Sequence, residues 1–225
     1  MQSHRQPQTR RKSKQPGNYM TIVQNSGPIK QNFLIDPALS VPSTLLPPRT
    51  PYESVAYENN VKVIQRNNLN IIAKRGEIDT NIVVMESDRQ TNFRVDVRSR
   101  GDIEIRLLLP GTISPDDPIR PGPLCLMNVY SSSGNIYLWI PRERLEGPLN
   151  VTARRDVQFS TALLEDLNIF NEREKWWKKR RECFIGNLAA WSEGAGDVIN
   201  LKAKAGSVFV QYIGEAVAND GVYHT

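Results

Sequence analysis

The stretch RSRGDIEIRLLL, residues 98–109, decides the fold class of this chain. Its Arg100-Gly101-Asp102 portion has the composition of a turn that leads directly into a strand. The residues after the turn alternate in polarity, which places the apolar ones on one face of a half-buried strand. These apolar residues are Ile103, Ile105, Leu107 and Leu109.

Short β-branched segments bounded by Asn, Gly and Pro continue this pattern along the chain. No helical segments alternate with them, which favours an antiparallel β-sandwich or barrel. Ser-Ser-Ser-Gly-Asn at 131–135 predicts a hairpin between two of the strands, and no internal repeat is apparent. The predicted strands cover 61–65, 69–73, 82–85, 93–98, 102–109, 124–130, 136–140, 149–153, 198–203 and 207–213.

Residues 161–184, TALLEDLNIFNEREKWWKKRRECF, contain neither Pro nor Gly and predict a helical insertion. At helical spacing, Phe170 and Trp177 continue an apolar stripe, so we expect the helix to pack through them. Three other interpretations stay open: a subunit interface, an RNA contact through Arg180 and Arg181, and membrane insertion, which the glutamates of this stretch disfavour.

The formal net charge of +5 is unevenly placed. Residues 1–35 hold six basic residues and no acidic one, which leaves 29 − 6 = 23 basic against 24 acidic residues in 36–225. Residues 1–27 are therefore predicted to form a disordered basic arm that binds RNA phosphates without base preference. The predicted RNA-binding residues are Arg5, Arg10, Arg11, Lys12 and Lys14.

Residues 28–54 combine many prolines with apolar side chains. They are too rich in proline for a helix or a central strand and too apolar for a free linker. We expect an extended strap that lies along another surface, while 55–225 form the sandwich domain. The residues expected at a subunit interface are Phe33, Leu34, Leu39, Leu45 and Leu46.

Several kinds of chemistry are disfavoured by composition. The only histidines, His4 and His224, lie at the two ends, which argues against a histidine-based triad or zinc site in the body. No Gly-rich phosphate-binding loop is present. Two cysteines, Cys125 and Cys183, suit a reducing compartment better than a disulfide framework. We therefore expect no enzymatic activity, no cofactor and no metal.

The order of basic arm, proline-rich segment and short strands resembles a jelly-roll capsid subunit of a small icosahedral, picorna-like RNA virus. The resemblance rests on RQPQTRRKSK (5–14) as the arm, on the strand set, and on RSRGDIEIRLLL. It implies assembly with other capsid subunits and contact with single-stranded RNA, without membrane insertion. It also implies a location in the virion, and in the host cytoplasm during assembly.

Two other classes of protein fit the same residues. One is a non-viral, RNA-binding structural protein of a ribonucleoprotein, with a β-barrel and a basic tail. The other is a β-sandwich enzyme or carbohydrate-binding module, which would need convergent carboxylates or exposed aromatic residues such as Trp139 and Trp191.

Overall fold

The computed structural model describes residues 15–58, 61–86, 92–110, 123–142, 144–190 and 196–215, and the side chains of these except 54–58, 61–64 and 190. The expected all-β class is confirmed, since strands dominate and the described residues contain a single α-helix, α1 (Thr161–Asp166). The strands are β1 (Met20–Gln24), β2 (Ile29–Ile35), β3 (Ser54–Glu58), β4 (Val61–Gln65), β5 (Leu69–Ala73), β6 (Ile78–Val84), β7 (Phe93–Ser99), β8 (Ile103–Leu108), β9 (Cys125–Ser131), β10 (Ile136–Ile140), β11 (Gly147–Ala153), β12 (Val157–Phe159), β13 (Leu167–Lys175), β14 (Lys178–Ile185), β15 (Val198–Ala203) and β16 (Val208–Tyr212).

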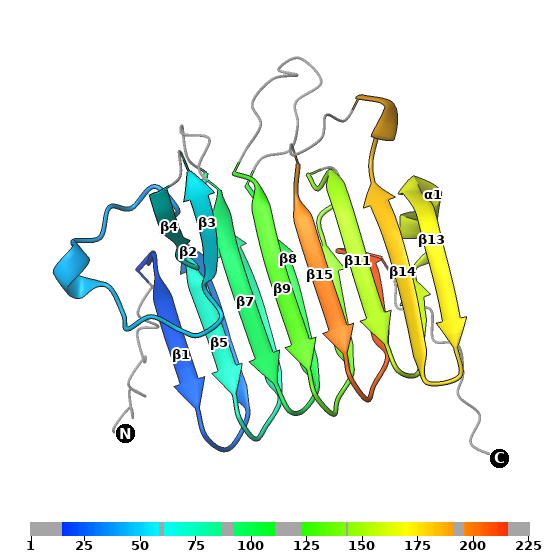
Figure 1. The fold of residues 1–225 in the computed structure, drawn as a ribbon, viewed down its shortest axis with the longest axis horizontal. Coiled ribbons are helices and arrows are strands. Elements are labelled where there is room, and N and C mark those ends of the chain that lie inside the picture. The colour runs from blue at the N-terminus through cyan, green and yellow to red at the C-terminus, as the bar shows by residue number, and fades with distance from the viewer. Residues whose placement is uncertain are drawn as a thin grey trace, which may run out of the picture.

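Two sheets face each other. The larger has the order β1-β5-β7-β9-β15-β11-β14-β13, and the smaller has the order β12-β16-β10-β8-β6-β2. After most strands of the larger sheet the chain turns a corner and enters the smaller sheet, as in β7 followed by β8 and β9 followed by β10. Neighbours within a sheet are therefore mostly parallel, and their corners stack along one edge of the molecule (Figure 1).

The predicted antiparallel sandwich of jelly-roll type is not the arrangement of the described strands. Antiparallel pairing among them is confined to β3–β4, β11–β14 and β13–β14. All ten predicted strands are present, but the turn at 131–135 joins β9 in one sheet to β10 in the other, so the predicted hairpin is wrong. The physical reason is that corners and hairpins use the same turn residues, and alternation reveals a buried face without revealing the neighbouring strand.

The core lies between the two sheets and is built from residues stacked in register. In the larger sheet, Val97 of β7 pairs with Ile71 of β5 and Val129 of β9. In the smaller sheet, Leu138 of β10 pairs with Ile105 and Val210. All of these side chains are buried. We call a strand of the larger sheet, the corner after it and the following strand of the smaller sheet one coil. Each coil therefore buries its apolar residues against the coils on either side of it.

A short sequence repeat accompanies the corners. In five corners a glycine precedes, by two residues, the first buried residue of the strand in the smaller sheet. The expectation that the chain lacks an internal repeat is therefore wrong; the repeated unit is short, and the spacing between its copies varies widely. The pairs are Gly27 and Ile29, Gly76 and Ile78, Gly101 and Ile103, Gly134 and Ile136, and Gly206 and Val208.

One coil is out of sequence order. β15 and β16 lie between the β9–β10 coil and the β11–β12 coil. Asp197, directly before β15, accepts hydrogen bonds from the backbone N–H of Cys125 (2.7 Å) and of Glu146 (2.9 Å). One buried carboxylate thus fastens the inserted strand to the first residue of β9 and to the residue directly before β11.

The N-terminal strands extend the two sheets beyond the predicted domain boundaries. β1, within the predicted arm of 1–27, pairs with β5, and β2, within the predicted strap of 28–54, pairs with β6. Residues 20–24 and 29–35 therefore belong to the sheets rather than to segments outside them.

The predicted helix at 161–184 is wrong beyond its first turns. Only α1 is helical, with the Ser160 hydroxyl accepting a hydrogen bond from the N–H of Leu163 at its N-terminus. β13 and β14 follow as an antiparallel hairpin. Phe170 and Trp177 are 58% and 46% exposed, so the packing predicted for them is also wrong. Opposite charges paired across the two strands favour the hairpin, as described below.

Candidate functional site

The stacked corners form one continuous edge, which we call the turn row. It comprises the turns 25–27, 74–77, 100–102, 132–134, 204–206 and 154–156, followed by the hairpin turn 175–178. Figure 1 shows these turns side by side along one edge, with the hairpin at one end. Six strand spacings separate the first turn from the last, which corresponds to roughly 29 Å.

Backbone hydrogen bonds hold successive turns in register. The N–H of Lys74 donates to the carbonyl of Gln24, that of Gly101 to Gly76, and that of Ser133 to Arg100. Further along the row, Lys204 N–H donates to the carbonyl of Ser131, and Arg154 N–H to that of Gly206. The side chains of the row therefore project from a fixed backbone.

The turn row is strongly cationic. Its basic side chains are all exposed, and none of them forms a salt bridge within the described residues. Three acidic residues oppose them, of which Asp102 and Asp156 already accept hydrogen bonds from the backbone of the turns. The basic residues are Lys74, Arg75, Arg100, Lys204, Arg154, Arg155, Lys175 and Lys178, and the acidic residues are Glu77, Asp102 and Asp156.

This edge concentrates charge that the sequence total hides. Eight basic and three acidic side chains give the row a net charge of 8 − 3 = +5. Residues 36–225 as a whole net 23 − 24 = −1, so their remainder nets −1 − 5 = −6. The net charge of residues 36–225 predicted a neutral body. The fold instead gathers positive charge on this edge and leaves the remainder negative.

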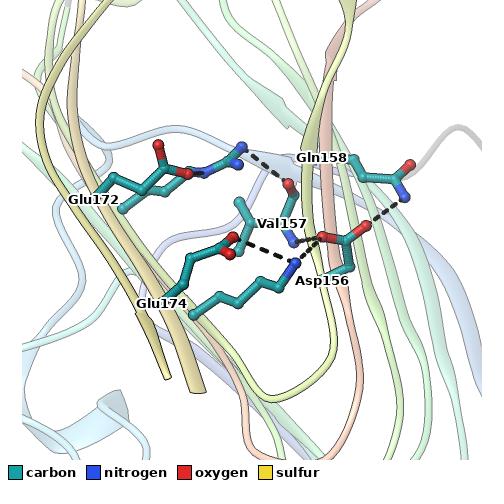
Figure 2. A network of polar contacts seen from close by, with 7 residues as sticks. Asp156, Val157, Gln158, Glu172 and Glu174 are labelled. Atoms are coloured by element: carbon teal, nitrogen blue, oxygen red, sulfur yellow. Dashed lines mark hydrogen bonds and ion pairs between the residues drawn. The ribbon is translucent and has the colours of Figure 1, made fainter. Parts of the chain in front are cut away.

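The hairpin at the end of the row has two different faces. On the face toward the smaller sheet, opposite charges pair across the strands: Glu172 with Arg181 and Glu174 with Lys179. Figure 2 shows this network extending to Asp156 and Val157. Hydrogen bonds to Asp156 and Glu174 raise the pKa of Lys179 and keep it charged.

The outer face of the hairpin carries like charges opposite each other. Arg173 pairs with Arg180, and Lys175 pairs with Lys178. Directly opposed like charges destabilise an antiparallel pair. Glu182 compensates only Arg180. An anionic ligand bound to this face would reduce the repulsion between these cations and so stabilise the hairpin.

Two tryptophans form the apex of the hairpin. Trp176 is 89% exposed, and its ring meets that of Trp177 edge to face at 5.2 Å between centroids. Lys175 Nζ lies 5.3 Å from the centroid of the Trp177 ring. An aromatic pair thus adjoins the cationic end of the row.

The residues predicted from the sequence lie elsewhere. Arg5, Arg10, Arg11, Lys12 and Lys14 fall outside the described residues. Among the predicted interface residues, Phe33 is buried in the core of its own chain and so has no side-chain surface left for a neighbouring subunit. Leu34 and Leu46 are half-buried, whereas Leu39 and Leu45 are exposed.

The outer face of the smaller sheet carries an aromatic cluster that bears on carbohydrate binding. Tyr137 stacks on Phe209 with 4.8 Å between centroids, and Arg106 lies 4.6 Å above the ring of Trp139. Sugar binding by stacking needs free ring faces, and these contacts occupy faces of all three rings. Trp191, the other aromatic residue considered, lies outside the described residues.

The described part of the chain contains no group of three or more His, Cys, Asp or Glu side chains placed to hold a metal ion. None of its helices is long and apolar enough to cross a bilayer.

Sequence reasoning missed the turn row because its cations are scattered from position 74 to position 204. The signal that marks them is the Gly-x-Ile/Val repeat, because in three of its five copies basic residues directly precede the glycine or lie two positions before it: Lys74-Arg75-Gly76, Arg100-Gly101 and Lys204-Ala205-Gly206. Aligning the copies would have brought these cations together.

Comparison with known proteins gives a family and no function. No curated protein and no solved structure matches the chain. A family described as "Domain of unknown function (DUF7330)" matches residues 18–215. That match spans all of the described strands, and the chain belongs to this family.

Proposed function

We propose that this protein is a non-enzymatic binding module that holds the phosphate backbone of single-stranded RNA along the turn row. The observation that carries the proposal is the line of eight exposed cations, which form no salt bridge within the described residues, on a backbone fixed by hydrogen bonds. Cations that neutralise phosphates release condensed counterions, and this term supplies most of the affinity in sequence-independent binding.

The shape of the site favours a chain-like ligand. The row is one turn wide and roughly 29 Å long, so it matches a linear polyanion better than a compact one. Because residues 36–225 outside the row net −6, a polyanion is repelled from the rest of the sheet domain and directed to this edge.

The N-terminal arm is a second, separate part of the proposal. Gly17 bridges to Ile35 at the end of β2, whereas the turn row lies at the start of β2. The described chain therefore begins at the end of the sheets opposite the row. Phosphate contacts by the five cations of the arm stay a prediction, to be measured independently of the row.

The test measures affinity for an unstructured RNA across a salt series. In the row variant Arg75→Gln/Arg100→Gln/Lys204→Gln, each lost phosphate contact should reduce the slope of log affinity against log salt by about 0.7. The loss should approach 2 for the three contacts together. All three side chains are exposed, so the variant should keep the circular dichroism spectrum of the wild type.

A matched control separates the row from net charge. Lys30→Gln/Arg49→Gln/Lys202→Gln removes the same charge from exposed positions outside the row and should keep the wild-type slope. Deletion of 1–14 in both backgrounds measures the contribution of the arm. Equal slopes for the row variant and the control variant would contradict the proposal.

Assembly into a capsid shell is a separate proposal that rests on the resemblance. What supports it is the exposure of Leu39 and Leu45 between β2 and β3, at 40% and 72%. Neighbouring copies would cover these side chains. Sedimentation velocity of the wild type and of Leu39→Ser/Leu45→Ser tests it, and an unchanged monomer in both would contradict it.

A further inference from the structure

The apex of the β13–β14 hairpin carries residues that are unusual in a two-residue hairpin loop. Two-residue hairpin loops favour Asn, Asp and Gly, which adopt positive φ at little cost. Here the loop is Trp176-Trp177, and neither residue has a positive φ. The chain therefore places two large apolar side chains where neither turn chemistry nor packing calls for them.

The exposed aromatic surface at the apex indicates an interaction site. Trp176 is almost fully exposed, and among the described residues its ring pairs with one aromatic ring, that of Trp177, edge to face. Exposed aromatic surface of this kind marks interaction sites. A local rule broken without a structural gain is the pattern expected at a functional position.

We propose that the Trp176-Trp177 apex stacks on unpaired nucleobases of an RNA strand whose phosphates lie along the turn row. This inference rests on the proposed function and adds to it a contact with the bases, which gives a physical cause for a preference for single-stranded over duplex RNA. Indole rings stack on any base, because every base has a π-face. Lys175 and Lys178, which close the turn, are placed to hold the adjacent phosphates.

A nucleobase is favoured over a lipid surface by the composition of the row. An edge that binds a bilayer along its whole length would need apolar side chains at several of its turns. The turns at 25–27 and 132–134 contain only Asn, Ser and Gly, which insert little into the acyl region. Apolar surface is confined to one end, as expected for a strand of RNA that stacks its bases there.

The experiment compares wild type, Trp176→Ala and Phe170→Ala. Phe170 is a matched control, because it is an exposed aromatic residue on the same hairpin and lies outside the apex. Each protein is titrated with an unstructured RNA strand, its blunt duplex, an abasic strand of equal length and phosphatidylserine-containing vesicles. Trp176→Ala should weaken binding to the unstructured strand about tenfold, with the salt slope unchanged.

The other ligands decide between interpretations. Affinity for the duplex and for the abasic strand should be the same in Trp176→Ala and wild type, and Phe170→Ala should match wild type throughout. An equal loss on the abasic strand, or no loss on the unstructured strand, overturns base stacking. Loss of vesicle binding with unchanged RNA binding overturns it in favour of a membrane contact. If wild-type protein binds no RNA in a salt-dependent manner, the proposed function itself fails.

Discussion

Gly134 lies so close to Gly101 that a β-carbon on Gly134 would come within 2.3 Å of the Gly101 carbonyl carbon. The contact is backbone to backbone, so no side chain can rotate away to relieve it. We expect Gly134→Ala to lower the free energy of unfolding by roughly 3 kcal/mol, as overpacking does at a rigid site.

The control for this prediction is Ser133→Ala in the same turn. Ser133 is exposed, so its variant should stay within about 0.5 kcal/mol of wild type. Urea unfolding monitored by circular dichroism measures both variants. Equal midpoints for Gly134→Ala and wild type would show that the corners are not stacked as described.

The strands of this fold were predictable from the sequence, but their pairing was not. Residues 69–73 and 136–140 were predicted with the bounds that the structure has. Alternating polarity and a high content of β-branched residues are local features of the sequence, and they indicate a strand whichever strand it pairs with. Whether a strand pairs with the next strand along the chain depends on the direction in which a turn sends it. The turn at 131–135 sends the chain across the core rather than back alongside itself.

The hairpin at 167–185 was misread for a related reason. Charged residues dominate it, but the prediction followed its apolar residues, among them Phe170 and Trp177, whose spacing was interpreted with a helical period. A period of two with reversal at Trp176-Trp177 pairs Glu172 with Arg181 and Glu174 with Lys179, which is the signal for two antiparallel strands. The candidate site depends on this reversal and on stacked corners, so sequence order alone could not assemble it.

Asp197 should make stability depend on pH. Burial raises the pKa of its carboxyl to about 6, against 3.8 for an unperturbed Asp. The folded state therefore binds the proton more tightly than the unfolded state within this window. The contribution of Asp197 is fully present below about pH 4 and is lost as pH rises through 6, by up to roughly 3 kcal/mol.

Asp197→Asn removes this titration and isolates it from that of other carboxyls. The amide offers one oxygen to two backbone N–H groups, so one of these groups loses its acceptor, which costs about 1–3 kcal/mol at every pH. Urea unfolding of both proteins from pH 4 to pH 7 provides the measurement. Relative to the variant, wild type should lose stability across this range, and a constant difference would rule out the assigned titration.

Arg181 should anchor the hairpin to the rest of the fold. Its Nε lies 2.6 Å from Glu172, and its guanidinium also donates to the carbonyl of Val157 at 3.0 Å. These bonds join β13 and β14 to β12 of the smaller sheet. Arg181→Ala should cost about 1–3 kcal/mol and increase amide hydrogen exchange in 167–185 before any other region. Uniform acceleration across both sheets would contradict a local anchor.

The two cysteines should report this local opening separately. Cys125 is fully buried in β9, at the centre of the larger sheet, and burial raises the pKa of its thiol well above the usual range. Cys183 lies in β14, and burial raises its pKa to about 11. Neither thiol should react in the closed structure at pH 8, because the thiolate is the nucleophile.

Labelling therefore requires opening, and the two sites open differently. β13 and β14 lie at one end of the larger sheet, beyond β11. The smaller sheet ends at β12, the strand that follows β11 in the chain, so among the described residues it has no strand that pairs with β13 or β14 in the same way. They should unfold locally, while exposure of β9 requires global unfolding. Iodoacetamide labelling at pH 8, followed by mass spectrometry of the peptides, should modify Cys183 first. Arg181→Ala should accelerate modification of Cys183 and leave the rate at Cys125 almost unchanged. Equal rates at both thiols in wild type would mean that the hairpin opens only with the whole molecule.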